Sequence, residues 1–421
     1  MENITTIIVD EGKEKLPLKH HPWIFSGAIA SVSDFTPEEG RTGTTAQVRT
    51  ADGHFIAWGW YDPQGSIPVR LLEWKESIRP DDGWWVQRLQ AAILRRKHFF
   101  VRPADGNLPQ TTSVRLVHGE ADMLPGIVID ILGSLARVII SARAGWDHRD
   151  VLIGAIEKLL SPSLIIMNTD AAFTAAEKLP VTEAWYKNGE RYYPEGRQKN
   201  IRFRENGFFY EINPGTGQKS GFYCDQRDNR AALEKWCVDA RVLDAFSYTG
   251  GFTLHALGAG AKHVHALDSS SPALRRLLAN VHINSDAGRL DATARDRVTI
   301  EECNVFEKLR DIPANSYDVV ILDPPKLAPS KSHVEAALKA YKDINRLAMN
   351  IVKDGGVIFT FSCSGAVDRE TFRTTLAWAA ADAKIEVQIL QVLGQAEDHP
   401  VRISFPESEY LSGYVLRVIK N

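Results

Sequence analysis

One cysteine of this chain ends a β-like run, where its side chain could act as a nucleophile. It is Cys363, the fifth residue of FTFSCSG (359–365), with Ser362 and Ser364 on either side. Free cysteine is among the most buried residue types, so packing at a strand end is the ordinary interpretation. A thiolate is also a strong nucleophile, and the flanking hydroxyls are candidates to stabilise one. The position of Cys363 in the fold must decide between the two interpretations.

Carboxylates end three other β-like runs. Asp244 lies in RVLDAF, which continues into SYTGGFT, where glycines let the backbone approach a ligand at a helix N-terminus that favours anions. Asp268 closes the next run twenty-four residues later, where an acidic side chain can accept both hydroxyls of a ribose. Helix capping is the alternative role for this aspartate. Together the two features favour nucleoside binding, although GxGxxG, the dinucleotide fingerprint, is absent.

The third carboxylate, Asp323, precedes two prolines in DPPK (323–326). Proline fixes the backbone and removes a donor, so the carboxylate is expected in a set geometry. Such a group accepts a hydrogen bond from the exocyclic amine of cytosine or adenine. A rigid turn with a capping aspartate is the alternative.

These residues follow strands of one predicted sheet. From residue 225 onward, helix-like stretches alternate with near-continuous apolar runs, which predicts a doubly wound parallel α/β domain. The expected strands are 241–246, 263–268, 297–302, 317–323 and 357–362. Ligands bind at the carboxyl ends of such strands, and the fourth and fifth strands commonly lie side by side. Asp323 and Cys363 are therefore expected at adjacent strand ends, which favours the nucleophile interpretation.

Two smaller parts are expected before this domain. Residues 1–74 predict a small β-barrel, with Asp52-Gly53 as a hairpin turn. Residues 75–200 predict a linking helix (84–100) and a small α+β domain with strands at 127–132, 136–141 and 164–168 and a helix at 149–160. Asn206-Gly207 predicts a hairpin at the entrance of the third part, 201–421.

Composition narrows the class of protein. The chain has 421 residues, 44% hydrophobic and 24% charged, which is ordinary for a globular protein of two to four domains. The four cysteines have neither zinc-site nor disulfide spacing, and neither a signal peptide nor a membrane-length apolar run is found, so a cytoplasmic setting is expected. The net charge of −3 counts mildly against nucleic-acid binding, although the stretch 88–102 is locally basic. A solvated helix face is its alternative interpretation.

Six motifs occur in a fixed order along the chain: KSGFYCDQRDNR, DAFSYTGGF, DPPK, YKDIN, FSCSG and EDHPV. In this order they resemble the large-subunit ribosomal RNA cytosine-5 methyltransferases of the RlmI type. HHPWIFSGAI and the strands after it resemble that family's PUA domain, and VHGEADMLPGIVID its central α/β domain. The resemblance implies a Rossmann-like methyltransferase domain, S-adenosylmethionine as methyl donor, and 23S rRNA, naked or in a partly assembled subunit, as substrate.

The resemblance also implies a cofactor site. Asp268 is assigned to the ribose and Asn304 to the adenine, where many relatives have Asp; the segment around Asp225 closes over the methionine moiety. A solvated helix face is the alternative for Arg227 and Arg230. The residues expected to bind the cofactor are Tyr223, Asp225, Arg227, Asp244, Phe246, Tyr248, Gly250, Asp268, Ser269, Asn304 and Val305.

The implied chemistry uses Cys363 and Asp323. The Cys363 thiolate adds to C6 of cytosine, so that C5 can attack the methyl group, while Asp323 contacts N3 and N4. The residues expected to contact the substrate are Pro324, Lys326, Tyr341 and His399, with packing as the alternative for Tyr341 and a structural role for His399. The base that removes the C5 proton is not identified, and no metal is expected.

Other functions remain open on the sequence alone. A methyltransferase acting on an exocyclic nitrogen or a purine often has an aromatic residue after the two prolines, where this chain has Lys326. An RNA-binding protein with a vestigial methyltransferase domain is the non-enzymatic alternative, and a nicotinamide dehydrogenase is disfavoured by the missing fingerprint. The sequence identifies neither the target cytosine nor the oligomeric state, for which a homodimer is one option.

Overall fold

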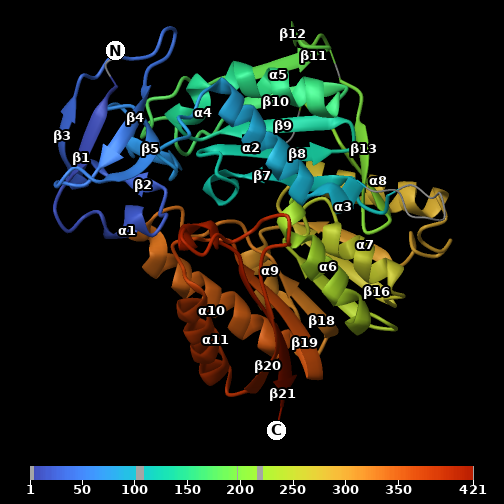
Figure 1. The fold of residues 1–421 in the computed structure, drawn as a ribbon. Coiled ribbons are helices and arrows are strands. Elements are labelled where there is room, and N and C mark those ends of the chain that lie inside the picture. The colour runs from blue at the N-terminus through green and yellow to red at the C-terminus, as the bar shows by residue number, and fades with distance from the viewer. Residues whose placement is uncertain (1–3, 101–108, 197, 216–220, 421) are drawn as a thin grey trace. The chain divides into compact units, whose positions relative to one another are not determined.

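The computed structural model describes residues 4–100, 109–196, 198–215 and 221–420 (Figure 1). The chain forms two compact units. The first contains Met1–Phe203, Asn213–Gly221 and Asp398–Ser408, and the second contains Arg204–Ile212, Phe222–Glu397 and Glu409–Asn421. Lys219 and Ser220 of the first motif, and residues 101–102 of the basic stretch, lie outside the described residues.

The first unit begins with a six-stranded sheet in the order β2-β6-β5-β4-β1-β3. Antiparallel pairing of β4 with β5 across Asp52-Gly53 confirms the predicted hairpin. The buried side chains of Ile7, Val48 and Leu71 form its core. Its elements are β1 (Thr6–Val9), α1 (Lys15–Leu18), β2 (Trp23–Ile24), β3 (Ile29–Ser33), β4 (Thr44–Arg49), β5 (Phe55–Tyr61) and β6 (Val69–Glu73).

A second six-stranded sheet, in the order β12-β11-β10-β9-β8-β7, completes the first unit. The linking helix α2 buries Trp85 and Leu89, as its apolar spacing predicts. The crossover helix α5 joins the parallel strands β9 and β10. The elements are α2 (Asp82–Arg95), α3 (Lys97–Phe100), β7 (Ser113–His118), β8 (Ile127–Leu132), β9 (Leu135–Ile140), α4 (Arg143–Asp147), α5 (Arg149–Leu160), β10 (Leu164–Thr169), β11 (Glu183–Lys187) and β12 (Glu190–Tyr192).

The second unit is built on a seven-stranded sheet in the order β17-β16-β15-β18-β19-β21-β20. The first five strands are parallel, which confirms the doubly wound prediction. The antiparallel strands β21 and β20, which were not predicted, extend it beyond β19. The strands are β15 (Arg241–Ala245), β16 (His263–Asp268), β17 (Val298–Glu302), β18 (Tyr317–Leu322), β19 (Val352–Ser362), β20 (Glu386–Leu393) and β21 (Ser412–Ile419).

Helices cover this sheet. On one face α10 and α11 lie side by side and bury Ile344 and Phe372 against strand residues such as Val320 and Ile358 (Figure 1). The amphipathic pattern of α10 accounts for this, because its apolar residues recur on one side. The helices are α6 (Arg227–Leu233), α7 (Gly251–Gly258), α8 (Ser271–Asp286), α9 (Val305–Asp311), α10 (Val334–Ile351) and α11 (Arg369–Ala383).

The predicted hairpin at Asn206-Gly207 is formed by β13 (Ile201–Glu205) and β14 (Phe208–Ile212). Two buried asparagines of α8 bond to the backbone of β14. The side chain of Asn284 accepts from the Phe209 N–H at 2.8 Å and donates to the Phe209 carbonyl at 2.7 Å. Asn280 accepts from the Glu211 N–H at 3.1 Å. The asparagines thus bond to a strand that pairs, among the described strands, with β13.

We expect Asn284→Ala to lower the free energy of unfolding by about 2–4 kcal/mol, because it leaves two backbone groups of β14 without their partner. Urea denaturation would measure the loss. His282→Ala, at an exposed position of the same helix, is the matched control and should change stability by less than about 0.5 kcal/mol. Equal stability of the two variants would contradict the prediction.

Candidate functional site

The carboxyl ends of β15, β16, β18 and β19 bring the predicted chemistry together. In the sheet, β18 lies between β15 and β19, so the turn after β18 is next to the end of each. The Cys363 Sγ lies 3.8 Å from the carbonyl oxygen of Pro324. The expected adjacency of the Asp-Pro-Pro turn and the cysteine is therefore present, and Pro324 is buried beneath the thiol.

Asp244 is a buried carboxylate with an unused oxygen. Its Oδ2 accepts from the Thr253 hydroxyl at 2.6 Å, whereas its Oδ1 is buried with no hydrogen-bond partner among the described residues. Burial raises the pKa of Asp244 to about 7; the bonds from Thr253 oppose the rise and the charge of Asp268 adds to it. A buried carboxylate oxygen without a donor is suited to a cationic ligand.

The turn after Asp244 has a constrained backbone. Phe246 and Tyr248 adopt positive φ values of 66° and 48°, which non-glycine residues rarely do. At Gly250 φ is 84°, and a Cβ there would lie 2.5 Å from Leu277 Cγ, so this position requires glycine. The turn thereby brings its backbone close to the strand ends, as a ligand cradle needs.

Asp268 holds this turn in place. Its Oδ2 accepts from the Tyr248 N–H and its Oδ1 from the Ser270 N–H, each at 2.8 Å. The cap of α8 is Ser270, not Asp268, so the capping alternative for Asp268 is wrong. Ser269, between the two, is exposed.

Asn304 lies at the start of α9. Its side-chain oxygen accepts from the Phe306 N–H at 3.1 Å and caps the helix, which uses one of the two lone pairs of that oxygen. Val305 is buried in the core of the unit, and the Phe306 ring lies 5.2 Å from that of Phe246. The assignment of Asn304 to the adenine stays a prediction.

The segment Tyr223–Arg230 is held from several sides. Asp225 Oδ2 accepts from the Tyr410 hydroxyl at 2.6 Å, while its Oδ1 is buried without a hydrogen-bond partner among the described residues. Arg230 pairs with the buried Glu205 and donates to the Tyr223 carbonyl at 2.6 Å. Arg227 and Arg230 are 2% and 4% exposed, so the solvated-face alternative is wrong for both.

Asp323 is half-buried at the end of β18. Its Oδ1 accepts from the Gln226 side-chain amide at 3.0 Å. Burial raises its pKa to about 7, and the charge of Asp225 adds to the rise while Arg230 opposes it. Burial also raises the pKa of Tyr223, with further contributions from the charges of Tyr248, Asp225, Cys363 and Asp323. The Tyr223 phenol therefore lies near both proposed catalytic groups.

The serines beside Cys363 have other roles. The Ser364 hydroxyl accepts from the Ala328 N–H at 3.1 Å and is 3.2 Å from the Tyr341 hydroxyl, and both serines are fully buried. The prediction that they stabilise a thiolate is therefore not supported. Cys363, in contrast, lies just beyond the end of β19 and is half-buried.

Two residues expected to contact the substrate are buried. Tyr341 has no exposed surface and supports Ser364 from α10. His399 belongs to the first unit, where it bonds to Asp398 at 3.0 Å and lies against the His118 ring. Direct contact with a substrate is not supported by these positions. Lys326, in contrast, is exposed.

Gln226 and Tyr410 were not singled out from the sequence. Gln226 lies inside the motif KSGFYCDQRDNR, which marks its neighbourhood, but nothing in the sequence indicates that it pairs with Asp323. Tyr410 is 185 residues from Asp225, and nothing in the sequence near it marks the contact.

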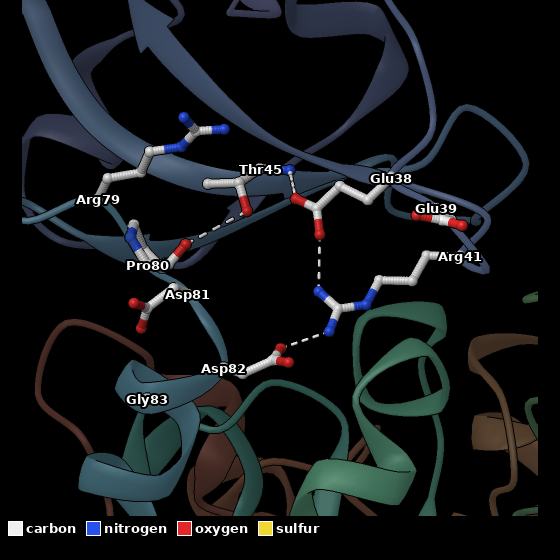
Figure 2. Close-up of a pocket in the computed structure, with 9 residues that line it drawn as sticks. All are labelled: Glu38, Glu39, Arg41, Thr45, Arg79, Pro80, Asp81, Asp82 and Gly83. Carbon is white, nitrogen blue, oxygen red and sulfur yellow. Dashed lines mark hydrogen bonds and ion pairs between the residues drawn. The ribbon is translucent and has the colours of Figure 1, made fainter. Parts of the chain in front are cut away.

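Two cavities elsewhere in the described part of the chain are lined by none of the predicted site residues. A cavity of about 630 Å³ in the first unit is lined by both acidic and basic side chains (Figure 2). Arg41 pairs there with Glu38 and Asp82, and no predicted site residue lines it.

In the basic stretch 88–102, Arg88 pairs with Glu73 and Arg96 pairs with Asp122, so two of the positive charges of this stretch are already paired. Metal-binding groups of acidic, histidine or cysteine side chains are not found within the described ranges, nor is a helix long and apolar enough to span a membrane.

Comparison with known proteins agrees with this geometry. Residues 7–74 match a PUA-like domain, and residues 192–388 match an S-adenosylmethionine-dependent methyltransferase domain. Ribosomal RNA large subunit methyltransferase I of Tolumonas auensis is 37% identical over 99% of this chain and 100% of its own; that of Alteromonas mediterranea is 35% identical over 98% of each. The chain belongs to the ribosomal RNA large subunit methyltransferase I family.

Solved structures agree with the fold of this family member. A methyltransferase crystallised in complex with SAH superposes with a TM-score of 0.78 at 19% identity, covering 99% of this chain and 100% of that one. The predicted combination of a PUA-like domain with a Rossmann-like methyltransferase domain is thus confirmed, as is an enzyme that depends on S-adenosylmethionine.

The residues at the strand ends fit this cofactor. S-adenosylmethionine carries a sulfonium and an ammonium charge, and two buried carboxylate oxygens, on Asp225 and Asp244, have no hydrogen-bond partner in the described part of the chain. Gly250 lets the turn pack against Leu277 of α8 at a positive φ, which fixes the backbone beside these carboxylates. Asp268 lies beside the turn, at the end of the adjacent strand.

We expect the affinity for the cofactor to decrease as the pH is lowered. Because the pKa of Asp244 is about 7 in the free protein, its protonated form dominates below that value and cannot pair with an ammonium group. The Kd for S-adenosylmethionine should rise by up to about tenfold per pH unit from about pH 7 downward. Calorimetry between about pH 5.5 and 7.5 would measure this, with proton release detected in buffers of different ionisation enthalpy.

Asp244→Asn should weaken binding and remove most of the pH dependence. Asp239→Asn, at an exposed position before the same strand, is the control and should bind as the unmodified protein does. A steep pH dependence that persists in Asp244→Asn would show that another group titrates.

Proposed function

We propose that this chain transfers a methyl group from S-adenosylmethionine to C5 of a cytosine in 23S rRNA, through a covalent bond between Cys363 and C6. The observation that carries the proposal is the position of the Cys363 thiol, 3.8 Å from the carbonyl of Pro324 at the end of the strand that presents Asp323. The names of the 35–37% identical relatives support a ribosomal RNA of the large subunit as substrate. Naked RNA and a partly assembled subunit are both candidates.

The chemistry assigns a role to each group. C5 of cytosine is a poor nucleophile, and addition of the Cys363 thiolate to C6 turns the ring into an enamine whose C5 can attack an electrophilic carbon. The cofactor, when bound, supplies that carbon as an activated methyl group. Asp323 meets N3 and N4: ionised, it accepts from the exocyclic amine, and protonated, it donates to N3 as negative charge develops. Loss of the C5 proton to a base then lets the thiolate leave and restores the ring.

The cofactor is proposed to be held as the sequence motifs imply. Asp225 and Asp244 would face the methionine moiety, where each has an unused buried oxygen. Phe246 and Gly250 would lie with Asp244 on the methionine side, Asp268 would meet the ribose, and Asn304 would meet the adenine. Tyr223, close to both Asp323 and Cys363, would separate the reacting atoms from water.

The proposal extends to the whole chain. Residues 1–74 would bind RNA, residues 75–200 would form the linking helix and central α+β domain, and residues 201–421 would catalyse, with Asp398–Ser408 packing in the first unit. Four free cysteines support a reducing, cytoplasmic setting. A homodimer is the assembly to test first, by light scattering, because Trp378, Ile389 and Val392 leave apolar surface exposed on α11 and β20.

Methylation of an exocyclic nitrogen or a purine is the second candidate. It has less support because the exposed Lys326 occupies the position where a stacking aromatic residue would follow the two prolines. Digestion of RNA methylated with labelled cofactor separates the two. Label in 5-methylcytidine supports the proposal, and label in another nucleoside overturns it.

We expect Cys363→Ala to lower methyl transfer by more than about a thousandfold while the Kd for S-adenosylmethionine changes less than about twofold, because the thiol acts on the base and not on the cofactor. Labelled methyl transfer and calorimetry measure the two effects. Cys303→Ala, which removes another half-buried thiol of the same unit, should keep its activity. Turnover by Cys363→Ala would exclude the covalent route.

A further inference from the structure

A single turn carries both Asp225, the carboxylate proposed to face the cofactor, and Gln226, which donates to Asp323, the carboxylate proposed to face the base. The 3-10 turn Cys224–Gln226 leads directly into α6. Gln226 is 3% exposed; its amide nitrogen donates to Asp323 Oδ1 at 3.0 Å, and its amide oxygen accepts from Asn229 at 2.6 Å. Because an amide donor occupies the oxygen of Gln226, the nitrogen must face Asp323.

The turn itself is held at both ends. Asn229 also donates to the Gly394 carbonyl at 2.9 Å. Asp225, the residue before Gln226, receives the Tyr410 hydroxyl on its side chain and the Ala396 N–H on its carbonyl at 2.9 Å. A shift of the turn would therefore displace Asp225 and the donor to Asp323 together.

We propose that Gln226 is a positioning residue that orients Asp323 for the target base and ties that orientation to the turn that faces the cofactor. The inference rests on the proposed function, because it assigns Asp323 to the base. With Oδ1 held by Gln226, Oδ2 is the oxygen directed to N3 and N4 of cytosine. Loss of the Gln226 donor leaves the carboxylate free to rotate.

Removal of this donor also has a predictable effect on titration. The ionisable groups that face Asp323 are Asp225, Arg230, Asp244, Tyr223 and Cys363. Burial and the two aspartates favour the protonated form of Asp323, whereas Arg230 and the Gln226 bond favour the ionised form. Without the bond, the pKa of Asp323 must move to higher pH. A glutamate at position 226 adds a negative charge and moves it further.

The experiment is the pH profile of kcat/KM for RNA in the unmodified enzyme, Gln226→Ala and Gln226→Glu. We expect the apparent pKa of the limb due to Asp323 to move to higher pH in the order unmodified enzyme, Gln226→Ala, Gln226→Glu. We also expect kcat at neutral pH to be lowered about tenfold in Gln226→Ala. The Kd for S-adenosylmethionine should stay within about twofold. Gln388→Glu, on the exposed edge of β20, adds the same charge elsewhere and should leave the profile unchanged.

Three results would overturn the inference. A loss of activity that is uniform across pH assigns Gln226 a structural role only, and thermal unfolding of Gln226→Glu, which keeps the side-chain shape, checks that role. Unchanged kinetics removes it from the reaction. A Kd for the cofactor raised more than tenfold with an unmoved limb places Gln226 in the cofactor site. Failure of the unmodified enzyme to make 5-methylcytidine instead overturns the proposed function, whatever the variants do.

Discussion

Burial of carboxylates at one sheet edge is the constraint around which the site of the second unit is arranged. Asp244 and Asp323, at the ends of adjacent strands, each have a pKa raised to about 7 by burial, and the charges of Asp268 and Asp225 respectively add to the rise. Arg230 opposes both rises, and it is itself fixed by Glu205 of the β13–β14 hairpin. Carboxylates kept in such an environment are costly for the free protein and are stabilised when a cation binds. The site is thus built to gain from a positively charged cofactor.

The fold around this edge was largely predictable, because it follows from local patterns. Apolar runs alternating with helix-like stretches specify a parallel sheet, and the chain order of such sheets places the fourth strand next to the fifth. Asp323 and Cys363 could therefore be assigned to adjacent strand ends before any coordinates were known. The antiparallel strand β20 was missed because Glu386–Leu393 is an edge strand whose side chains are mostly exposed, so it lacks the apolar run of its neighbours. Strand β21 is mostly buried and has such a run, so exposure does not explain why it was missed.

The contacts that orient the site were not predictable, for two physical reasons. A hydrogen bond such as that from Tyr410 to Asp225 depends on tertiary proximity and leaves no periodic signal in either segment. Adjacency in sequence was also misleading: Ser362 and Ser364 flank Cys363, but both serines are fully buried, and the Ser364 hydroxyl bonds to Ala328 and Tyr341. Arg230 likewise has the local pattern of an exposed helix charge, and only its pairing with Glu205 explains its burial.

The chain between β20 and β21 gives the site a covalent connection to the first unit. Its two stems hold the turn: the Ala396 N–H donates to the Asp225 carbonyl and the Tyr410 hydroxyl to its side chain. The residues between the stems, Asp398–Ser408, pack instead within the first unit, where the Phe405 ring lies 4.6 Å from Trp23 and Arg402 donates to the His20 carbonyl. Only a few peptide bonds separate these two sets of contacts. One loop thus carries contacts of both units, and its stems hold the turn at Asp225.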